Sequence, residues 1–274
     1  TLIDSSIIKK KKKDFIEEIF DELFTQKNEK FIKFVTDFGT KNARQTKKTI
    51  LNLDYSFDLI TKKEDYLNNY IESYYNKNNL DKLSKIKFLV VGLGSVGSIV
   101  PISLVRSGVK NITIIDKDKV EDSNLNRQIA YNFNDIGTLK SVALKKHLLE
   151  IRSDINVTEI HDDIKNISSL NDKFDYVVDC IDDIKGKIHL IEYAFKNDIK
   201  IISSLGMGNR FDPTKVKITK LNKTTIDPLA RKLRYELKKR NVDISLINVS
   251  FSEESPIIKD RVISSMIFTP NASG

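Results

Sequence analysis

The sequence is poor in the residues that build disulfide frameworks and zinc sites. Cys180 is the only cysteine among 274 residues, so one chain forms neither a disulfide framework nor a four-thiolate zinc site. The three histidines, His147, His161 and His189, are scattered and make no spaced metal motif. No apolar run approaches the roughly 18 residues of a membrane span. These absences favour a soluble protein of a reducing compartment.

Positive charge is in excess over negative charge. The chain carries 46 Lys and Arg against 38 Asp and Glu, which gives a net charge of +8. Such an excess favours a polyanionic partner such as nucleic acid, but a simple composition bias toward Lys, Asn and Ile explains it equally well. Charge alone therefore leaves a nucleic-acid partner open.

A glycine motif after a short apolar run is the strongest local signal. Residues 87–91 read KFLVV, and Gly92, Gly94 and Gly97 follow in the spacing G-x-G-x-x-G. This pattern is typical of a buried strand that turns into a helix whose first amides face a phosphate. Asp116 ends a second apolar run 22 positions after Gly94, close to the roughly 20-residue spacing of a ribose-binding carboxylate. A nucleotide site is therefore predicted.

Strands and helices alternate along residues 85–274. The patterns predict strands at 87–91, 111–115, 156–160, 175–180 and 200–204. They predict helices at about 95–107, 138–151, 186–197 and 227–241, with a loop at 132–137. This alternation predicts an α/β fold with a doubly wound, Rossmann-like, mostly parallel sheet.

Residues 1–84 are predicted to form a helical N-terminal extension. Apolar side chains at helical spacing in residues 15–24 suit a helix packed on the domain or on a second subunit, or a membrane-surface helix. Acidic residues on its polar face favour packing, because anionic lipid repels them. The Asn-rich stretch 76–81 is interpreted as a turn at the domain boundary. Arg44 is either a phosphate-reaching residue or an ordinary solvated one.

Polar and charged residues crowd the segment that follows Asp116. These residues are Asp118, Asn124, Asn126, Arg127 and Gln128. Two later residues belong to the same set: Lys140, at the start of a predicted helix, and Asp182, at the end of a predicted strand. A dehydrogenase needs only one acid there, whereas this set can hold ribose and a triphosphate. Ligands of such sheets bind beyond the carboxyl ends of the strands, so we expect these side chains to converge on one crevice. Two cations and a carboxylate suited to Mg²⁺ fit phosphoryl chemistry.

Four motifs resemble those of a known superfamily. They are GLGSVGS at 92–98, IDKDKVEDSNLNRQ at 115–128, IGTLK at 136–140 and VVDCIDD at 177–183. They are similar to the ThiF-type adenylating superfamily, which includes the ubiquitin-activating enzymes and the bacterial activators of sulfur-carrier proteins. Stretches 203–240 and 248–256 resemble the branch of tRNA threonylcarbamoyladenosine dehydratases. The resemblance runs from about residue 85 to 274, and residues 1–84 match nothing in the family.

The resemblance implies an ATP-dependent ligase or cyclase. Such an enzyme adenylates the threonyl carboxylate of the modified adenosine beside the anticodon of tRNA and closes it to a ring with loss of AMP. In the site that the resemblance implies, Gly92, Gly94 and Gly97 flank the nucleotide and Asp116 holds the ribose. Asn124 and Gln128 complete the pocket, with Asp118 and Asn126 beside them. Arg127 and Lys140 hold phosphates, and Asp182 holds Mg²⁺. Arg127, Lys140 and Asp182 are the expected catalytic set.

The resemblance also implies partners and a location. We expect tRNA bearing threonylcarbamoyladenosine as substrate and a homodimer, in the cytoplasm or on an organelle surface such as that of a mitochondrion. Two departures from the family pattern stand out. A short arginine-bearing N-terminal segment is not evident, so Arg44 of the same or a partner subunit is a candidate for its role. The family usually continues past the position of Gly274 into another helix, so the C-terminal end is expected to be truncated.

A basic helix offers a candidate tRNA contact. Its cations are Arg231, Lys232, Arg234, Lys238, Lys239 and Arg240, with Tyr235 between them. They form either a track for tRNA phosphates or the solvated face of a helix that packs through its leucines. With the family resemblance, the tRNA role is the favoured one.

Two rival functions remain open. One is an activator that adenylates the C-terminal glycine of a ubiquitin-like or sulfur-carrier protein, and the other is a non-catalytic binding module with the same fold. Thioester-forming relatives need a positioned cysteine, whereas Cys180 lies inside a predicted strand and is expected to be buried and inert. Intact Arg127, Lys140 and Asp182 argue against a non-catalytic module.

Overall fold

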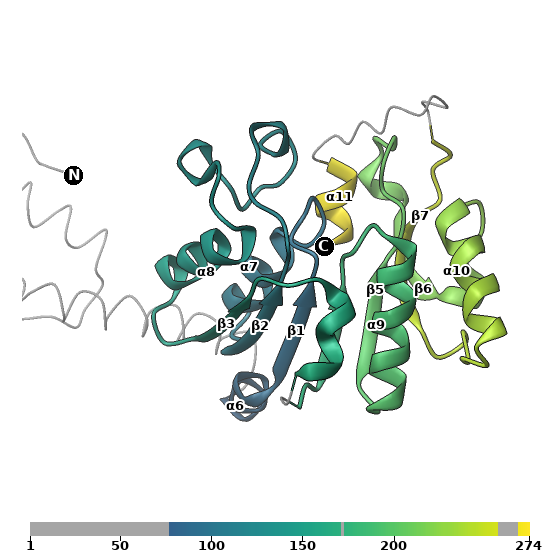
Figure 1. The fold of residues 1–274 in the computed structure, drawn as a ribbon, viewed down its shortest axis with the longest axis horizontal. Coiled ribbons are helices and arrows are strands. Elements are labelled where there is room, and N and C mark those ends of the chain that lie inside the picture. The colour runs from purple at the N-terminus through teal and green to yellow at the C-terminus, as the bar shows by residue number, and fades with distance from the viewer. Residues whose placement is uncertain (1–76, 171–172, 257–267) are drawn as a thin grey trace, which may run out of the picture. The chain divides into compact units, whose positions relative to one another are not determined.

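The computed structural model describes residues 77–170, 173–256 and 268–274. The strands are β1 (Lys87–Val91), β2 (Asn111–Ile115), β3 (Asn156–Ile160), β4 (Tyr176–Asp179), β5 (Lys200–Ser204), β6 (Val216–Lys220) and β7 (Asn248–Ser252). The helices are α6 (Lys77–Lys85), α7 (Ile99–Arg106), α8 (Lys140–Ile151), α9 (Ile184–Lys196), α10 (Pro228–Lys239) and α11 (Phe268–Ser273), as Figure 1 shows. The strands and helices predicted between residues 87 and 241 are all present, with ends displaced by a few residues.

The strands of the described residues form one sheet in the order β3-β2-β1-β4-β5-β7-β6. Neighbouring strands are parallel throughout, except that β6 runs antiparallel to β7. The chain builds one half of the sheet outward from β1 and then returns to start β4 on the other side of it. This reversal makes a topological switch point between β1 and β4, where such sheets bind their ligands. The predicted α/β fold is confirmed.

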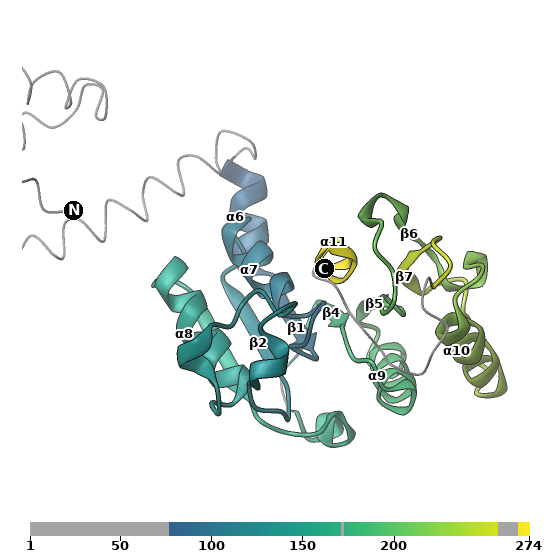
Figure 2. The same ribbon diagram turned by 90° about the horizontal axis from the view of Figure 1, so that it is seen from above.

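Helices cover both faces of the sheet. The core on one face takes side chains from α7 and α8, and the core on the other takes them from α9 and α10, so the two pairs lie on opposite sides in the view from above (Figure 2). Strand β1 serves both cores, since Val90 belongs to the first and Leu89 and Val91 to the second. Among the described helices, none is long and apolar enough to cross a membrane.

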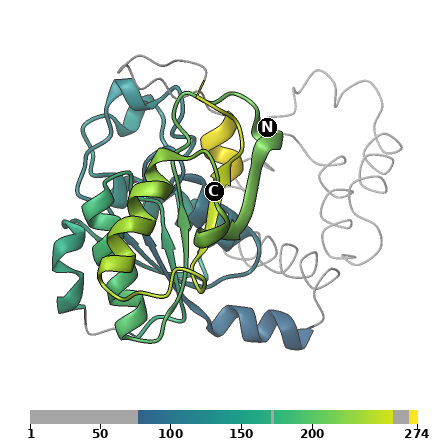
Figure 3. The same cartoon turned by 90° about the vertical axis from the view of Figure 1, so that its right-hand side faces the viewer.

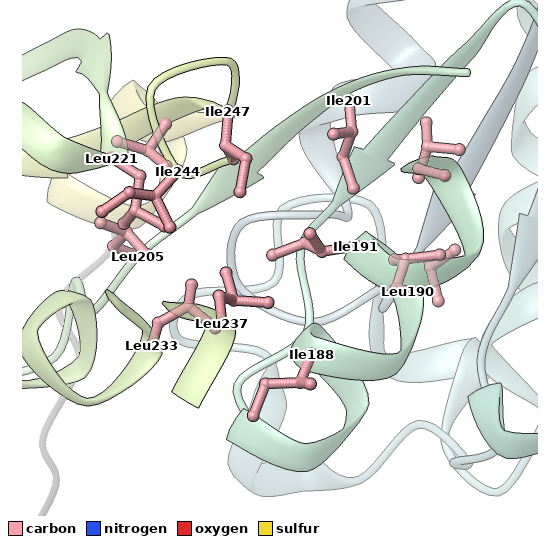
Figure 4. Packing of buried hydrophobic residues seen from close by; sticks show 14 of the residues in the cluster. Ile188, Leu190, Ile191, Ile201, Leu205, Leu221, Leu233, Leu237, Ile244 and Ile247 are labelled. Atoms are coloured by element: carbon pink, nitrogen blue, oxygen red, sulfur yellow. The ribbon is translucent and has the colours of Figure 1, made fainter. Parts of the chain in front are cut away.

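The second core joins α10 to the rest of the domain. Leu233 and Leu237 of α10 lie near Ile188 and Ile191 of α9 in the close view (Figure 4), and all four side chains are buried. Figure 3 shows α10 in front of the sheet when the β6 edge is turned toward the reader. Asp227 begins this helix by accepting a hydrogen bond from the Ala230 amide at 3.0 Å, and Pro228 follows at the first helical position.

Three local predictions need correction. The turn predicted at 76–81 is wrong for residues 77–81, because α6 spans Lys77–Lys85, with Leu80 buried and Leu83 packed against the first core. Helix α7 begins at Ile99 rather than near 95, since the glycine turn occupies the residues before it. Strand β6 was not among the predicted strands, because it is a short edge strand with two lysines and an exposed Ile218.

Candidate functional site

A cavity of about 1100 Å³ opens at the carboxyl ends of β1, β2, β4 and β5. The predicted site residues that line it are Gly92, Gly94, Asp116, Asp118, Asn124, Arg127, Gln128, Lys140 and Asp182. Gly97 and Asn126 are not part of the lining. The structure therefore brings most of the predicted residues to one crevice at the switch point between β1 and β4, where a nucleotide is expected.

The three glycines of the turn after β1 have different surroundings. Gly92 has a φ of +85°, and a Cβ there would lie 2.9 Å from the Cys180 backbone. A Cβ on Gly97 would overlap the Gly92 carbonyl oxygen, so Gly97 lets the turn pack closely. Beside Gly94 the nearest atom to a built Cβ is Gln128 Nε2, at 3.9 Å. Close packing thus explains two of the glycines, and Gly94 leaves open space beside the cavity.

Asp116 braces the glycine turn. Its Oδ2 accepts a hydrogen bond from the Leu93 amide at 2.6 Å, and its Oδ1 accepts one from the Asp118 amide at 2.7 Å. Burial raises the pKa of Asp116, although these backbone bonds and nearby Lys140 oppose the shift. Each carboxylate oxygen can accept a second hydrogen bond, so a ribose contact stays a prediction.

Lys140 reaches the cavity through a folded loop between β2 and α8. Lys119 pairs with Leu139 in an isolated antiparallel bridge, which returns the chain to the cavity just before α8. Lys140 is buried at the first position of that helix, with Nζ 3.5 Å from Asp118 Oδ2. A buried ammonium with one carboxylate partner at that distance suits an anionic ligand that adds further contacts.

Arg127 approaches the cavity from the middle of the same loop. Its Nη1 donates to the Ser123 carbonyl oxygen at 2.7 Å and to Asn126 Oδ1 at 2.8 Å. Asn124 is buried and its Oδ1 accepts from the Glu121 amide at 3.2 Å. Asn124 and Asn126 therefore shape the loop and orient Arg127, and no contact with a ligand is needed to explain them.

The end of β4 carries three acids with three different environments. Asp179 is fully buried and accepts hydrogen bonds from Lys187 Nζ at 3.0 Å and Ser203 Oγ at 2.5 Å. Asp183 begins α9 by accepting from the Gly186 amide at 2.8 Å. Asp182 is exposed, lines the cavity and makes no hydrogen bond or ion pair with any described residue. Of these three acids, Asp182 is the one whose carboxylate has no partner among the described residues and is available to a ligand.

Lys187 is a functional candidate that sequence reasoning missed. Its side chain is fully buried, and Nζ also donates to Ser203 Oγ at 3.2 Å and to the Ser204 carbonyl oxygen at 2.5 Å. This network ties the ends of β4 and β5 together directly below the cavity. Cys180 lies beside it, and burial raises the pKa of its thiol to about 12, so the thiol stays protonated near neutral pH.

The far wall of the cavity was also missed. It is formed by the turn Gly206–Arg210 after β5, with Asp227 at the start of α10 and His189 and Lys185 on α9. The signal in the sequence was a glycine-rich segment, GMGNR, directly after a strand. The sequence shows where this glycine-rich segment lies along the chain. It does not show that the segment lines the same cavity as the glycine turn after β1.

The six cations of α10 fall into two groups. Arg231, Lys232, Lys238 and Lys239 are exposed, and Lys239 Nζ lies 4.1 Å from the centre of the Tyr235 ring. Arg234 instead donates to the Thr224 carbonyl oxygen at 3.0 Å, and Arg240 pairs with Glu192 at 3.2 Å and Glu236 at 2.9 Å. The first group is exposed and makes no ion pair with a described residue, so it is accessible to a polyanion. In the second group, half-buried Arg234 and exposed Arg240 are already bonded to the protein. Arg44 and the helix expected at 15–24 lie outside the described residues.

Comparison with known proteins gives relatives for most of the chain. The model of the ThiF family matches residues 66–232. The protein tRNA threonylcarbamoyladenosine dehydratase 2 of Saccharomyces cerevisiae is 42% identical over 195 residues, which are 69% of this chain and 43% of the yeast protein. The tRNA threonylcarbamoyladenosine dehydratase of Bacillus subtilis is 35% identical over 185 residues, 66% of this chain and 72% of that protein. This chain thus spans less than half of the length of the yeast relative.

Solved structures agree with the sequence relatives. The crystal structure of the Escherichia coli tRNA N6-threonylcarbamoyladenosine dehydratase in complex with ATP superposes with a TM-score of 0.69 at 29% identity. The match covers 74% of this chain and 87% of that chain. The family model matches residues 66–232, which is more than half of the sequence. The chain therefore belongs to the ThiF family.

Proposed function

We propose that this chain is an ATP-dependent tRNA threonylcarbamoyladenosine dehydratase. The observation that carries the proposal is the gathering of Arg127, Lys140 and an uncommitted Asp182 around one cavity beside the glycine turn of β1. Relatives named as such dehydratases in yeast and Bacillus subtilis support the choice of substrate, and the Escherichia coli relative is known in complex with ATP. The proposed activity therefore combines adenylation with tRNA modification.

The proposed first step forms an acyl-adenylate. An oxygen of the threonyl carboxylate attacks the α-phosphorus of ATP, the bond to the β-phosphate oxygen breaks, and pyrophosphate leaves. Negative charge grows on the phosphate oxygens during this step. The guanidinium of Arg127 and the ammonium of Lys140 would stabilise that charge, because both line the same cavity.

The proposed second step closes the ring. A nitrogen of the threonylcarbamoyl group attacks the activated acyl carbon, its proton passes to solvent, and AMP leaves with the electrons of the broken bond. The nucleoside loses one water in total, and ATP becomes AMP and pyrophosphate. No thiol takes part, which suits a chain whose only cysteine has a strongly raised pKa.

Asp182 is the proposed Mg²⁺ ligand. Mg²⁺ is commonly held by one or two carboxylates together with substrate phosphates, and it neutralises phosphate charge when bound. The Asp182 carboxylate fits this role, because it lines the cavity and no described residue pairs with it. Buried Asp179 and the helix-capping Asp183 already have partners, so they are not ligands in this proposal.

The proposed macromolecular partners are tRNA and a second copy of the chain. Exposed cations on α10 supply a candidate track for tRNA phosphates, whose contribution to affinity would fall with salt. The homodimer follows from the family resemblance alone. Light scattering of the purified chain at micromolar concentration tests it, and a monomer mass would remove it.

The deciding experiment measures AMP release. The full chain is incubated with ATP and tRNA carrying threonylcarbamoyladenosine, with tRNA lacking it, and without tRNA. We expect release only with the modified tRNA, together with loss of one water from the nucleoside by mass spectrometry. If tRNA makes no difference and a carrier protein with a C-terminal glycine instead drives pyrophosphate exchange, the chain is a carrier-protein activator.

A further inference from the structure

We propose that the turn Gly206–Arg210 is a subsite for the acyl group of the second substrate. Its backbone amides would donate hydrogen bonds to the carbonyl oxygen of the acid that is being activated. The inference rests on the proposed function, because it assigns one wall of the same cavity to the substrate that is not ATP. Neither the glycine turn of β1 nor the loop that carries Arg127 and Lys140 takes part in it.

The cavity is large enough for two ligands. Its volume of about 1100 Å³ exceeds the range of about 300–1,000 Å³ that is usual for one small molecule. The residues proposed to hold ATP lie after β1, β2 and β4. The turn Gly206–Arg210 lies after β5, with Asp227 and Pro228 at the start of α10 beside it. One part of the cavity therefore has no role in the nucleotide proposal.

The turn offers hydrogen-bond donors without partners. The amides of Gly206, Met207 and Gly208 donate to no acceptor in the part of the chain that the structure describes. Each of the three residues lines the cavity, and the Met207 side chain is buried. Gly206 and Gly208 are half-buried and Met207 is buried. Adjacent backbone amides that line a cavity without a protein acceptor are available to an oxygen of a ligand.

Buried Arg210 and half-buried Glu254 hold the turn in place. Arg210 is 3% exposed, donates from Nε to the Glu254 carbonyl oxygen at 2.9 Å and donates from Nη1 to the Gly206 carbonyl oxygen. The Glu254 carboxylate accepts from the amides of Phe211 and Asp212, both at 2.9 Å. The turn is thus anchored to the end of β7 on both sides. Donors fixed in advance stabilise charge that develops during a reaction, since they need no reorganisation.

Electrostatics separate this subsite from a phosphate site. Burial lowers the pKa of Arg210, while Asp227 and Glu254 oppose that shift and balance its positive charge. Arg210 Nη2 lies 3.7 Å from Asp227 Oδ2, and neither atom has a hydrogen-bond partner among the described residues. The turn therefore presents donors without excess positive charge. This chemistry suits the oxygen of a carbonyl or carboxyl group better than a triphosphate.

The subsite has a defined part in the proposed ring closure. When the substrate nitrogen attacks the acyl carbon, an electron pair moves onto the carbonyl oxygen. That electron pair re-forms the carbonyl double bond as the bond between the acyl carbon and the AMP oxygen breaks and AMP leaves. Amides of the turn would donate to that oxygen while it carries negative charge, as backbone donors do in acyl-transfer enzymes.

The test compares two substitutions of one residue. Gly208→Pro removes the amide donor, whereas Gly208→Ala adds a methyl group and keeps the donor. The readout is the ratio of kcat for modified tRNA between the Ala and Pro variants, which we expect to be about 100-fold. Affinity for ATP, measured by competition with a fluorescent ATP analogue, and affinity for tRNA, measured by filter binding, should stay equal in the two variants.

A second variant covers a failure of the proline protein to fold. Replacement of Gly208 by glycolic acid turns the amide into an ester, which removes the donor and leaves the shape of the turn nearly unchanged. Equal kcat for the ester protein and the wild type would overturn the subsite while the proposed function stands. Loss of ATP affinity along with kcat would also overturn it, because the turn would then serve the nucleotide. An inactive wild type would overturn the proposed function and the subsite together.

Discussion

The two walls of the cavity use charged residues in opposite ways. On the wall proposed to hold the nucleotide, Asp182 has no partner among the described residues, and Lys140 Nζ has one described carboxylate partner, Asp118, at 3.5 Å. On the opposite wall, Arg210 is tied to backbone carbonyl oxygens and balanced by acids. At the end of β4, the fully buried side chains of Lys187 and Asp179 pair with one another, with Nζ 3.0 Å from Oδ2. A charge that the fold already uses holds a wall in place, and an uncommitted charge is available to a ligand.

Loss of a committed charge should cost the most stability. Lys187→Met leaves the fully buried Asp179 without its cation, so we expect the free energy of unfolding to fall by about 3–5 kcal/mol. Urea denaturation followed by circular dichroism measures it. The double variant Lys187→Met with Asp179→Leu should recover part of the loss. A single variant as stable as the wild type would break the comparison.

Loss of the uncommitted charge should instead remove activity. Asp182→Ala should lower kcat with modified tRNA by at least about 100-fold, because the proposed Mg²⁺ ligand is gone, and leave the melting temperature nearly unchanged. The neighbouring Asp183→Ala is the matched control. It should cost about 1 kcal/mol of stability, because α9 loses the side chain that caps it. Equal activity losses in both variants would contradict the separate roles of these two acids.

The same distinction applies to the cations of α10. Lys232→Ala and Lys238→Ala should each lower tRNA affinity several-fold and reduce the slope of log affinity against log salt by roughly one, since each side chain is exposed. Arg234→Met should leave that slope unchanged and lower the melting temperature, because Arg234 is bonded to the Thr224 carbonyl oxygen. Filter binding at salt concentrations between about 50 and 200 mM measures the slope.

The smallest expected effect depends on pH. A hydrogen bond from Arg152, with a second from Lys110, lowers the pKa of Asp154 to about 2 from its ordinary 3.8. Because the folded pKa lies below the unfolded one, the stabilisation is present above the unfolded pKa and is lost as the pH falls toward 2. Asp154→Asn should therefore destabilise the protein by about 1 kcal/mol near neutral pH, with partial exposure limiting the effect. The difference from wild type should disappear in acid, and a constant difference at every pH would argue against it.

Most of the fold was predictable because its signals are local. The apolar run at 87–91, the spacing of Gly92, Gly94 and Gly97, and the alternation that follows led to the correct sheet. Edge strand β6 was not predicted, since none of its residues is fully buried and its two lysines obscure the apolar pattern of a strand. Helix α6 was predicted as a turn, because asparagine is common in turns. Its leucines favour a helix only once they pack against the rest of the domain.

The candidate site was predictable only on the nucleotide wall. Gly92, Gly94, Asp116 and Asp182 lie within a few positions of a strand end, so the parallel sheet brings them to one edge. Arg127 and Lys140 reach that edge through the loop between β2 and α8. The far wall depends on contacts between distant segments, such as that of Arg210 with the Glu254 carbonyl oxygen. No local pattern in the sequence encodes such a contact.

The sequence by itself determined the order of the elements, the glycine turn and the set of charges beyond the strands. Whether each charge was free or committed was decided by the tertiary structure. In the segment D-C-I-D-D the three acids have the same chemistry but different roles. Asp179 is buried against Lys187, Asp182 faces the cavity without a described partner, and Asp183 caps α9. Burial and the partner within reach set the role of a carboxylate, and both arise only when distant parts of the chain pack together.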